Sequence, residues 1–182
     1  MNVQEVILVN DEDEAIGTMD KMEAHRKAAL HRAFSVFIFN SRGEMLLQQR
    51  AENKYHSAGL WTNACCSHPV PGEDTGEGAV RRLKEEMGFT TELENLFSFT
   101  YRSAYSNGLT ENEVDHVFAG IYDQEINPDR SEVKDYCFMN MESIAESLHT
   151  HPQKYTSWFH IAFPPIREWA SERFGTIKET ER

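Results

Sequence analysis

Residues 73–89 read EDTGEGAVRRLKEEMGF and carry the most regular pattern in the chain. Within them Ala79, Leu83 and Met87 recur every four positions, so they share one face of a helix. An aspartate precedes this pattern as an N-cap, and a glycine follows it as a C-terminal stop. The stretch therefore predicts a helix over residues 76–87 whose apolar face packs on a sheet.

The other faces of this helix are charged. Arg81 precedes Glu85 by four residues, and Arg82 precedes Glu86 by the same interval. Pairs at this spacing stabilise a solvated helix by about 0.2–0.5 kcal/mol each. Taken alone, the charges predict two exposed ion pairs and no chemistry.

Several of these charged residues also belong to a longer sequence motif. The residues that match the motif are Glu73, Arg81, Leu83, Glu85, Glu86, Gly88 and Phe89. Their spacing resembles the Nudix signature, in which glutamates hold Mg²⁺ ions that activate water. The resemblance implies an α/β protein of the Nudix type, an α/β/α sandwich with a mixed sheet flanked by helices, as a single catalytic domain over residues 1–182.

Two positions depart from the signature. Ser67 stands where its first glycine is expected, and Arg82 stands where it has a glutamate. A cation in place of a metal ligand argues against ordinary hydrolysis, whereas the expectation for the fold is unaffected.

The rest of the chain mixes strand and helix patterns, which is typical of an α/β sandwich. We predict strands at residues 5–10, 31–40, 45–50, 60–66, 113–122 and 133–139. Two or three helices are expected over residues 141–174, interrupted by Pro152 and by Pro164-Pro165.

Composition excludes some classes of protein. A formal net charge of −12 over 182 residues disfavours nucleic acid, because phosphate backbones need clustered Lys and Arg. The apolar run at residues 33–39 is far shorter than the ~20 residues of a membrane span. An odd number of cysteines, two of them adjacent, suits a reducing compartment, so we expect a cytoplasmic protein.

Two short motifs indicate a polar site. Cys66 and His68 are two residues apart, as are Glu111 and Glu113, so each pair points to one side of an extended segment. The candidate metal ligands are His25, His31, His68, Glu111 and Glu113. Such a set suits octahedral Mn²⁺, Mg²⁺ or Fe²⁺, or Zn²⁺ with a spare position. A structural zinc site or an ordinary buried cysteine remains the alternative from spacing alone.

These motifs occur in the order found in the type I isopentenyl-diphosphate isomerases. The matching segments are those around Cys66, residues 73–89, Tyr101-Arg102, residues 111–114 and Ser157-Trp158. The resemblance spans residues 6–174. It implies an enzyme of isoprenoid biosynthesis that interconverts isopentenyl and dimethylallyl diphosphate by a metal-dependent 1,3 proton shift through a carbocation.

The resemblance also implies roles for individual residues. Cys66 and Glu113, the latter assisted by Tyr101, resemble the proton-transferring pair. The five candidate ligands resemble those of a tightly held divalent metal, with Mn²⁺ expected first and Zn²⁺ or Mg²⁺ as alternatives. Glu86 and the backbone carbonyl of Cys66 resemble the ligands of a second ion, a Mg²⁺ that bridges to the diphosphate. The implied substrate contacts are Lys21, Arg50, Lys54, Ser67, Arg82 and Trp158.

The expected partner is therefore a small diphosphate, with no nucleic acid and no membrane, bound by a monomer or weak homodimer. A Nudix pyrophosphohydrolase of a nucleoside diphosphate derivative is the alternative, and it accounts for Glu73, Glu85 and Glu86. It leaves Cys66 and Arg82 unexplained. A metal-bound interaction domain would need no facing acid and base.

Overall fold

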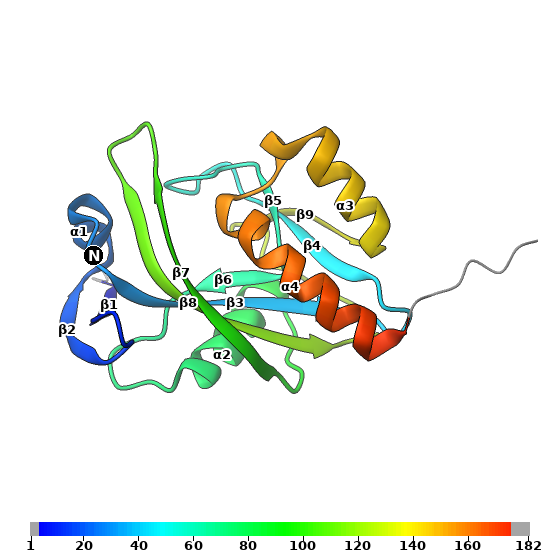
Figure 1. The fold of residues 1–182 in the computed structure, drawn as a ribbon, viewed down its shortest axis with the longest axis horizontal. Helices are drawn as coiled ribbons and strands as arrows, with labels where there is room; N and C mark the ends of the chain where they lie inside the picture. The colour runs from blue at the N-terminus through cyan, green and yellow to red at the C-terminus, as the bar shows by residue number, and fades with distance from the viewer. Residues whose placement is uncertain (1–3, 176–182) are drawn as a thin grey trace, which may run out of the picture.

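The chain folds into a sheet with helices on both sides (Figure 1). The computed structural model describes residues 4–175. In chain order the elements are β1 (Glu5–Val9), β2 (Ala15–Asp20), α1 (Lys21–Lys27), β3 (His31–Phe39), β4 (Met45–Arg50), β5 (Trp61–Thr62), β6 (Cys65–Ser67), α2 (Thr75–Met87), β7 (Glu94–Ala104), β8 (Thr110–Ile121), β9 (Val133–Met139), α3 (Met141–Thr150), a 3₁₀ turn η1 (Pro152–Lys154) and α4 (Ser157–Phe174).

The sheet is mixed, as predicted. Nine strands take part in the described chain, and β3 lies at the centre with β1, β4, β6 and β8 as hydrogen-bonded neighbours. β8 runs parallel to β3, whereas β1, β4 and β6 are antiparallel to it. β7 pairs with β8 as an antiparallel hairpin, and β9 and β5 both pair with β4.

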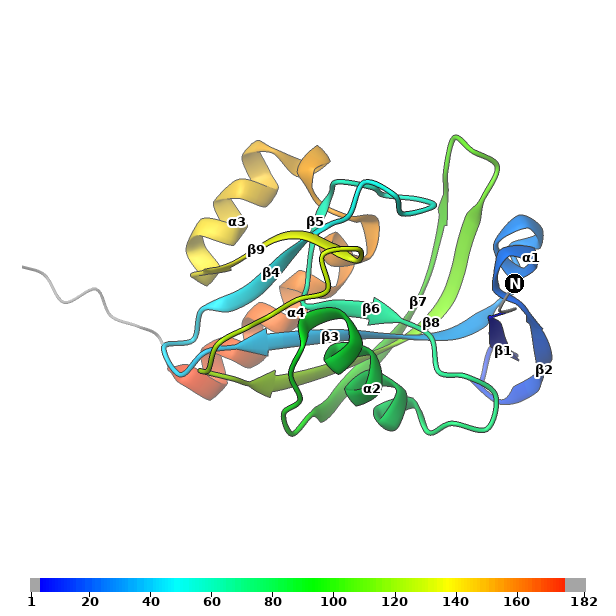
Figure 2. The same ribbon diagram turned by 180° about the vertical axis from the view of Figure 1, so that it is seen from behind.

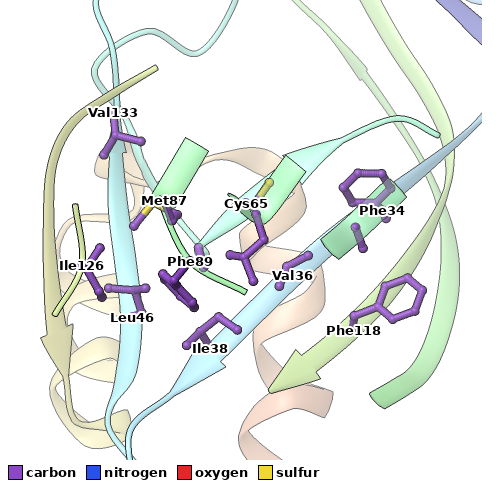
Figure 3. Packing of buried hydrophobic residues seen from close by; sticks show 13 residues of the cluster. Phe34, Val36, Ile38, Leu46, Cys65, Met87, Phe89, Phe118, Ile126 and Val133 are labelled. Carbon is purple, nitrogen blue, oxygen red and sulfur yellow. The ribbon is translucent and has the colours of Figure 1, made fainter. Parts of the chain in front are cut away.

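Alternating side chains of β3 build two cores. Phe34, Val36 and Ile38 point to one face, where α2 covers them (Figures 2 and 3). Phe37 and Phe39 point to the opposite face and pack in the cluster that contains the apolar side of α4. This period-two alternation is what a strand buried on both faces requires. The predicted α/β/α sandwich is confirmed.

The predicted helix at residues 76–87 is also confirmed, with its start at Thr75. The Asp74 side chain caps it by accepting hydrogen bonds from the backbone N–H groups of Gly76 and Glu77. Gly88 ends it with a φ of 81°, and a Cβ there would lie 2.2 Å from the carbonyl oxygen of Asn127. Only glycine fits this combination of backbone angle and close approach.

The single strand predicted at residues 60–66 is wrong, because the segment divides into β5 and β6. Between them Asn63 donates side-chain hydrogen bonds to the carbonyl oxygens of Val36 and Cys65. These bonds replace ladder bonds and let the chain leave β4 and join β3. The division places Cys66 directly opposite Ser35.

The predicted interruption at Pro164-Pro165 is wrong as well. α4 runs unbroken from Ser157 to Phe174, and both prolines lie on its exposed face. The buried face packs on the sheet and holds the helix where two backbone donors are missing. Among the described helices, none combines the length and apolar character that a membrane span needs.

Three elements escaped the sequence analysis: β2, α1 and β7. α1 carries His25, one of the candidate metal ligands. β7 has a visible signal, since Phe97, Phe99 and Tyr101 alternate at period two.

Candidate active site

The parallel pairing of β3 with β8 sets the base of the site. It places His31 directly beside Glu113 as register partners. Because side chains alternate along a strand, Glu111, Glu113 and Asp115 project from the same face of β8. His68 follows β6, which also pairs with β3, and completes the base of the site.

The polar atoms of these residues converge. His31 Nε2 lies 3.2 Å from His68 Nε2 and 3.1 Å from Glu113 Oε1, and His68 Nε2 lies 2.9 Å from the same oxygen. His25 Nε2 lies 3.9 Å from it. Two adjacent ligands that each lie ~2.1 Å from an ion are about 3 Å apart. The four residues therefore have the spacing of ligands around one divalent ion.

The histidines have the protonation that metal binding needs. His25 Nδ1 donates to the Lys21 carbonyl at 2.6 Å, and His31 Nδ1 donates to that of Ala29 at 2.8 Å. Each carbonyl fixes the tautomer and leaves a lone pair on Nε2. His25 Nε2 is buried and has no hydrogen-bond partner among residues 4–175. This orphaned nitrogen is what a missing cation would satisfy, so the donor set fits a metal.

The charges of the cluster agree with this assignment. Burial opposes ionisation of Glu113, but hydrogen bonds with His31 and His68 outweigh it and hold the pKa of the carboxyl well below its usual value. Burial lowers the pKa of His68 to about 4, so that ring is neutral near pH 7. For His31 burial acts in the same direction, yet Glu113 raises its pKa above the usual value.

Tyrosine hydroxyls hold the far oxygens of both glutamates. The Tyr101 hydroxyl lies 2.7 Å from Glu111 Oε2 and 2.9 Å from Glu113 Oε2, and that of Tyr105 donates to Glu111 Oε2 at 2.8 Å. Burial and the two carboxylates raise the pKa of Tyr101 well above its usual value, so it remains a phenol. Each glutamate therefore turns one oxygen, Oε1, toward the histidines.

Cys66 lies in the wall of the same cavity. Its thiol donates to Asn63 Oδ1 at 3.1 Å and lies 3.5 Å from Ser35 Oγ. Burial raises the pKa of Cys66, so the side chain is a thiol in the absence of substrate. Cys65, its neighbour, points into the opposite core and is fully buried.

The cavity that joins these groups is small. Its lining includes the three predicted catalytic residues Cys66, Tyr101 and Glu113, together with Trp158. Its volume is about 30 Å³, which holds one or two water molecules and no more. Trp158 is fixed there by an indole N–H bond to Asn63 Oδ1 at 3.2 Å.

A second, more open cavity of about 330 Å³ adjoins the first one. Arg50, Cys66, Ser67 and His68 belong to both linings. The predicted substrate contacts and metal ligand found in its wall are Lys21, Arg50, Lys54, Ser67, Arg82 and Glu86. The sequence-predicted residues thus separate into a hydrogen-bonded pocket with the thiol and a cationic pocket beside it.

Helix α2 supplies the acidic corner of this cationic cavity. Arg82 donates to Ser67 Oγ at 3.2 Å and to Glu86 Oε1 at 2.7 Å, and it also pairs with Glu85. Glu73 does not reach the cavity, because both its oxygens bind Arg81 at 2.7 and 3.0 Å. The predicted pairing of Glu85 with Arg81 is present, at 3.4 Å. Glu86 alone among these three glutamates lines the site.

Sequence reasoning missed several buried polar residues of the site, among them Ser35, His56, Asn63 and Asp115. Asp115 continues the period-two spacing of the two glutamates and could have been found from it. His56 and Asn63 lie between strands, where no periodic signal marks a side chain as inward-facing.

Comparison with known proteins agrees with this geometry. A sequence model of the NUDIX domain matches residues 29–159. The fold resembles a 1.9 Å crystal structure of DR0079 from Deinococcus radiodurans, with a TM-score of 0.69 and 18% identity over 81% of this chain and 90% of that one. It also resembles the MutT protein from Methanosarcina mazei, with a TM-score of 0.62 and 21% identity over 81% and 96%. This chain is therefore a Nudix-domain protein.

Curated relatives narrow the class. The isopentenyl-diphosphate Delta-isomerase of Pectobacterium atrosepticum is 48% identical over 93% of this chain and 94% of its own. That of Serratia proteamaculans is 47% identical over 94% and 96%. The chain belongs to the isopentenyl-diphosphate Delta-isomerase family.

Proposed function

We propose that this chain interconverts isopentenyl diphosphate and dimethylallyl diphosphate by a metal-dependent 1,3 proton shift. The observation that carries the proposal is the shared lining of one small cavity by Cys66, Tyr101 and Glu113, next to a cationic cavity. An alkene is a weak base, and its protonation gives a carbocation. The reaction therefore needs an acid against one carbon and a base at another, in a site without water.

Cys66 and Glu113 form the acid–base pair in this proposal. Tyr101 assists proton transfer at Glu113 through its hydrogen bond to that carboxylate. The support is the hydrogen bond from the Tyr101 hydroxyl to Glu113 Oε2 and the thiol form of Cys66. A thiol can give a proton, and a carboxylate can take one. In the reverse reaction the two exchange roles.

Trp158 supplies the surface for the cation. Its side chain is buried and held by Asn63, and the Arg50 guanidinium lies 5.4 Å from its ring. A cation thus already rests against this indole without substrate. An indole face attracts a desolvated cation by about 2 kcal/mol or more.

Four cations bind the diphosphate in the neighbouring cavity, namely Lys21, Arg50, Lys54 and Arg82. Without substrate two of them are paired with acids, Lys54 with Glu132 and Arg82 with Glu86. Ser67 Oγ supplies a further polar contact. Binding energy from this distant group can hold the reacting end in the small cavity beside Cys66.

Two divalent ions complete the site as proposed. His25, His31, His68, Glu111 and Glu113 hold the tight one, for which we propose Mn²⁺, with Zn²⁺ or Mg²⁺ as the alternatives. That ion supplies positive charge that tunes Glu113 and fixes its rotamer. Glu86 and the Cys66 carbonyl hold a Mg²⁺ that neutralises the diphosphate.

We further propose that residues 1–182 act as one catalytic domain, as a monomer or weak homodimer in the cytoplasm. Lys21 of α1 and Trp158 of α4 line adjoining cavities, which supports a single unit. The pyrophosphohydrolase alternative is not favoured. Glu73 is bound to Arg81 instead of facing the cavity, and the relatives carry the isomerase name.

Proton NMR of the protein with isopentenyl diphosphate and Mg²⁺ in D₂O tests the proposal, with phosphate release followed in parallel. The expected result is the allylic isomer with deuterium incorporated and no phosphate. Release of phosphate or monophosphate without the isomer would show that the chain is a hydrolase and would refute the proposal.

A further inference from the structure

Asn63 lies in the short segment between β5 and β6, and the proposed reaction gives it no role. The residue is fully buried. Its amide nitrogen donates to two backbone carbonyl oxygens, that of Val36 on β3 at 3.0 Å and that of Cys65 on β6 at 2.9 Å. Because both N–H groups are used, the amide cannot exchange its nitrogen and oxygen without losing both bonds. The central sheet therefore fixes the direction of the amide oxygen.

That amide oxygen is the acceptor for three side chains. It receives the Thr62 hydroxyl at 2.8 Å, the Cys66 thiol at 3.1 Å and the indole N–H of Trp158 at 3.2 Å. The thiol belongs to the proposed acid–base pair, and the indole is the proposed surface for the carbocation. They come from β6 and α4, which are far apart in the chain. One oxygen atom thus sets the position of each of these groups relative to the other.

The thiol of Cys66 has a second acceptor within reach. Ser35 Oγ lies 3.5 Å from Cys66 Sγ and donates its own hydrogen bond to Asp115 Oδ2 at 2.7 Å, so it faces the sulfur with lone pairs. A thiol has one proton and serves one acceptor at a time. The shorter contact, to Asn63, decides between the two directions. Without that acceptor the S–H bond turns toward Ser35.

The ring of Trp158 depends on the same oxygen. The Thr62 hydroxyl lies 2.9 Å from that of Thr156, the residue before α4, and the Thr156 N–H donates to the Trp61 carbonyl at 3.1 Å. These bonds tie the start of α4 to β5. They place the backbone of Trp158, which is the second residue of the helix. The bond from its indole N–H to Asn63 then selects the orientation of the ring.

We propose that Asn63 is a positioning residue, which holds the Cys66 thiol and the Trp158 ring face in the mutual alignment that alkene protonation needs. The inference rests on the proposed function. Proton transfer forms a bond at one carbon and leaves positive charge on its neighbour, so both groups must be in place at once. Asn63 does not belong to the wall of the cationic cavity. Its loss should therefore affect kcat and not diphosphate binding.

The direct test is the infrared S–H stretching band of Cys66, obtained as the difference between the wild type and Cys66→Ala. A thiol that donates a hydrogen bond absorbs at a lower frequency than a free thiol. Asn63→Ala should move the band to higher frequency, whereas Ser35→Ala should leave it in place. Asn63→Ala should also lower kcat about 100-fold, as small misplacements of reacting groups do, with an unchanged Kd for inorganic pyrophosphate in Mg²⁺.

Asn40→Ala is the matched control. Asn40 is also buried, and its side chain accepts from the backbone N–H groups of Arg42 and Glu44 in the turn between β3 and β4. This variant should lose unfolding free energy and keep both kcat and the S–H band. Trp158→Phe gives a second readout, because it removes the same indole N–H bond. Its effect on kcat and that of Asn63→Ala should be less than additive in free energy in the double variant.

A wild-type band at the frequency of a free thiol, or a band that does not move in Asn63→Ala, would overturn the proposal. Equal losses of kcat in Asn63→Ala and Asn40→Ala would do the same, because they would indicate a structural role only. If Asn63→Ala does not fold, Ser35→Ala decides, since a band that moves in that variant shows that the thiol serves Ser35 instead. A hydrogen-bonded thiol in a wild type without isomerase activity would refute the proposed function itself.

Discussion

Arg82 Nη2 lies 2.7 Å from Glu86 Oε1, one turn further along α2, in the wall of the cationic cavity. The Nudix signature has a glutamate at the position of Arg82. A guanidinium beside the remaining carboxylate gives this corner both signs of charge. Such a corner can bind a diphosphate oxygen and its Mg²⁺ side by side, and it lacks the glutamate that the signature has at this position of the helix.

Replacing Arg82 should therefore weaken diphosphate binding. We expect Arg82→Gln to raise the Kd for inorganic pyrophosphate in Mg²⁺ about 30-fold, since losing one partner of a buried charge pair costs about 2 kcal/mol or more. Calorimetric titration measures it. Arg81→Gln is the matched control, because Arg81 binds Glu73 outside the cavity. Equal Kd values for the two variants would contradict the assignment.

The adjacent cysteines give a paired test of catalysis. Cys66→Ala should lower turnover by about 10²–10⁴-fold, as removal of a proton-transfer group does, while the metal content is unchanged. Cys65→Ala should keep turnover and lose about 1 kcal/mol of unfolding free energy, because its side chain lies in the core. Turnover by NMR and urea unfolding measure both. Near-normal turnover of Cys66→Ala would remove the thiol from the mechanism.

We expect the ring face of Trp158 to stabilise the carbocation and so to raise kcat. Trp158→Phe keeps a weaker aromatic face, so we expect a modest loss of kcat. Trp158→Ala removes the face and should lower kcat by about 30-fold, or about 2 kcal/mol. Similar small losses in both variants would mean that the indole only packs.

Glu73 should contribute to stability and not to turnover. The hydrogen bonds from Arg81 lower the pKa of its carboxyl below the usual value. Because the folded-state pKa is the lower one, the stabilisation is present above about pH 4.5 and is lost as pH falls through the folded value. Glu73→Gln should cost about 1 kcal/mol at pH 7, and less at pH 3.

Urea unfolding at both pH values checks the Glu73 prediction, with isomerisation measured at pH 7. Glu73→Ala at the same two values serves as a second variant. A large loss of turnover in the Gln variant would show that Glu73 binds metal as in the hydrolases.

Removal of the tight ion should lower the melting temperature and take up protons. An ion at 100 times its Kd stabilises the folded state by about 2.7 kcal/mol. Glu113 raises the pKa of His31, so its ring holds a proton more readily than a free imidazole does, and that proton must leave when the ring binds an ion; metal addition to the chelated protein should therefore acidify a weakly buffered solution near pH 7. His31→Gln should abolish that release. An unchanged melting temperature after complete chelation would argue against a structural ion.

Local patterns explain what the sequence could predict. The apolar period of α2 and the two-residue spacing of Glu111 with Glu113 survive folding because each lies in one regular element. His56 and Asn63 face the cavity only because loops turn them inward. The two prolines of α4 misled because a proline removes a backbone donor but does not by itself end a helix whose other face is packed on the sheet.

His31 and Glu113 are 82 positions apart in the chain and adjacent in the sheet. Parallel neighbours cannot form by local hairpin closure, so this pairing has high contact order and is slow to form. During synthesis, Glu111 and Glu113 are added only after more than a hundred residues have been made. We therefore expect the proposed ion to bind late in folding, after the central strands β3 and β8 have paired.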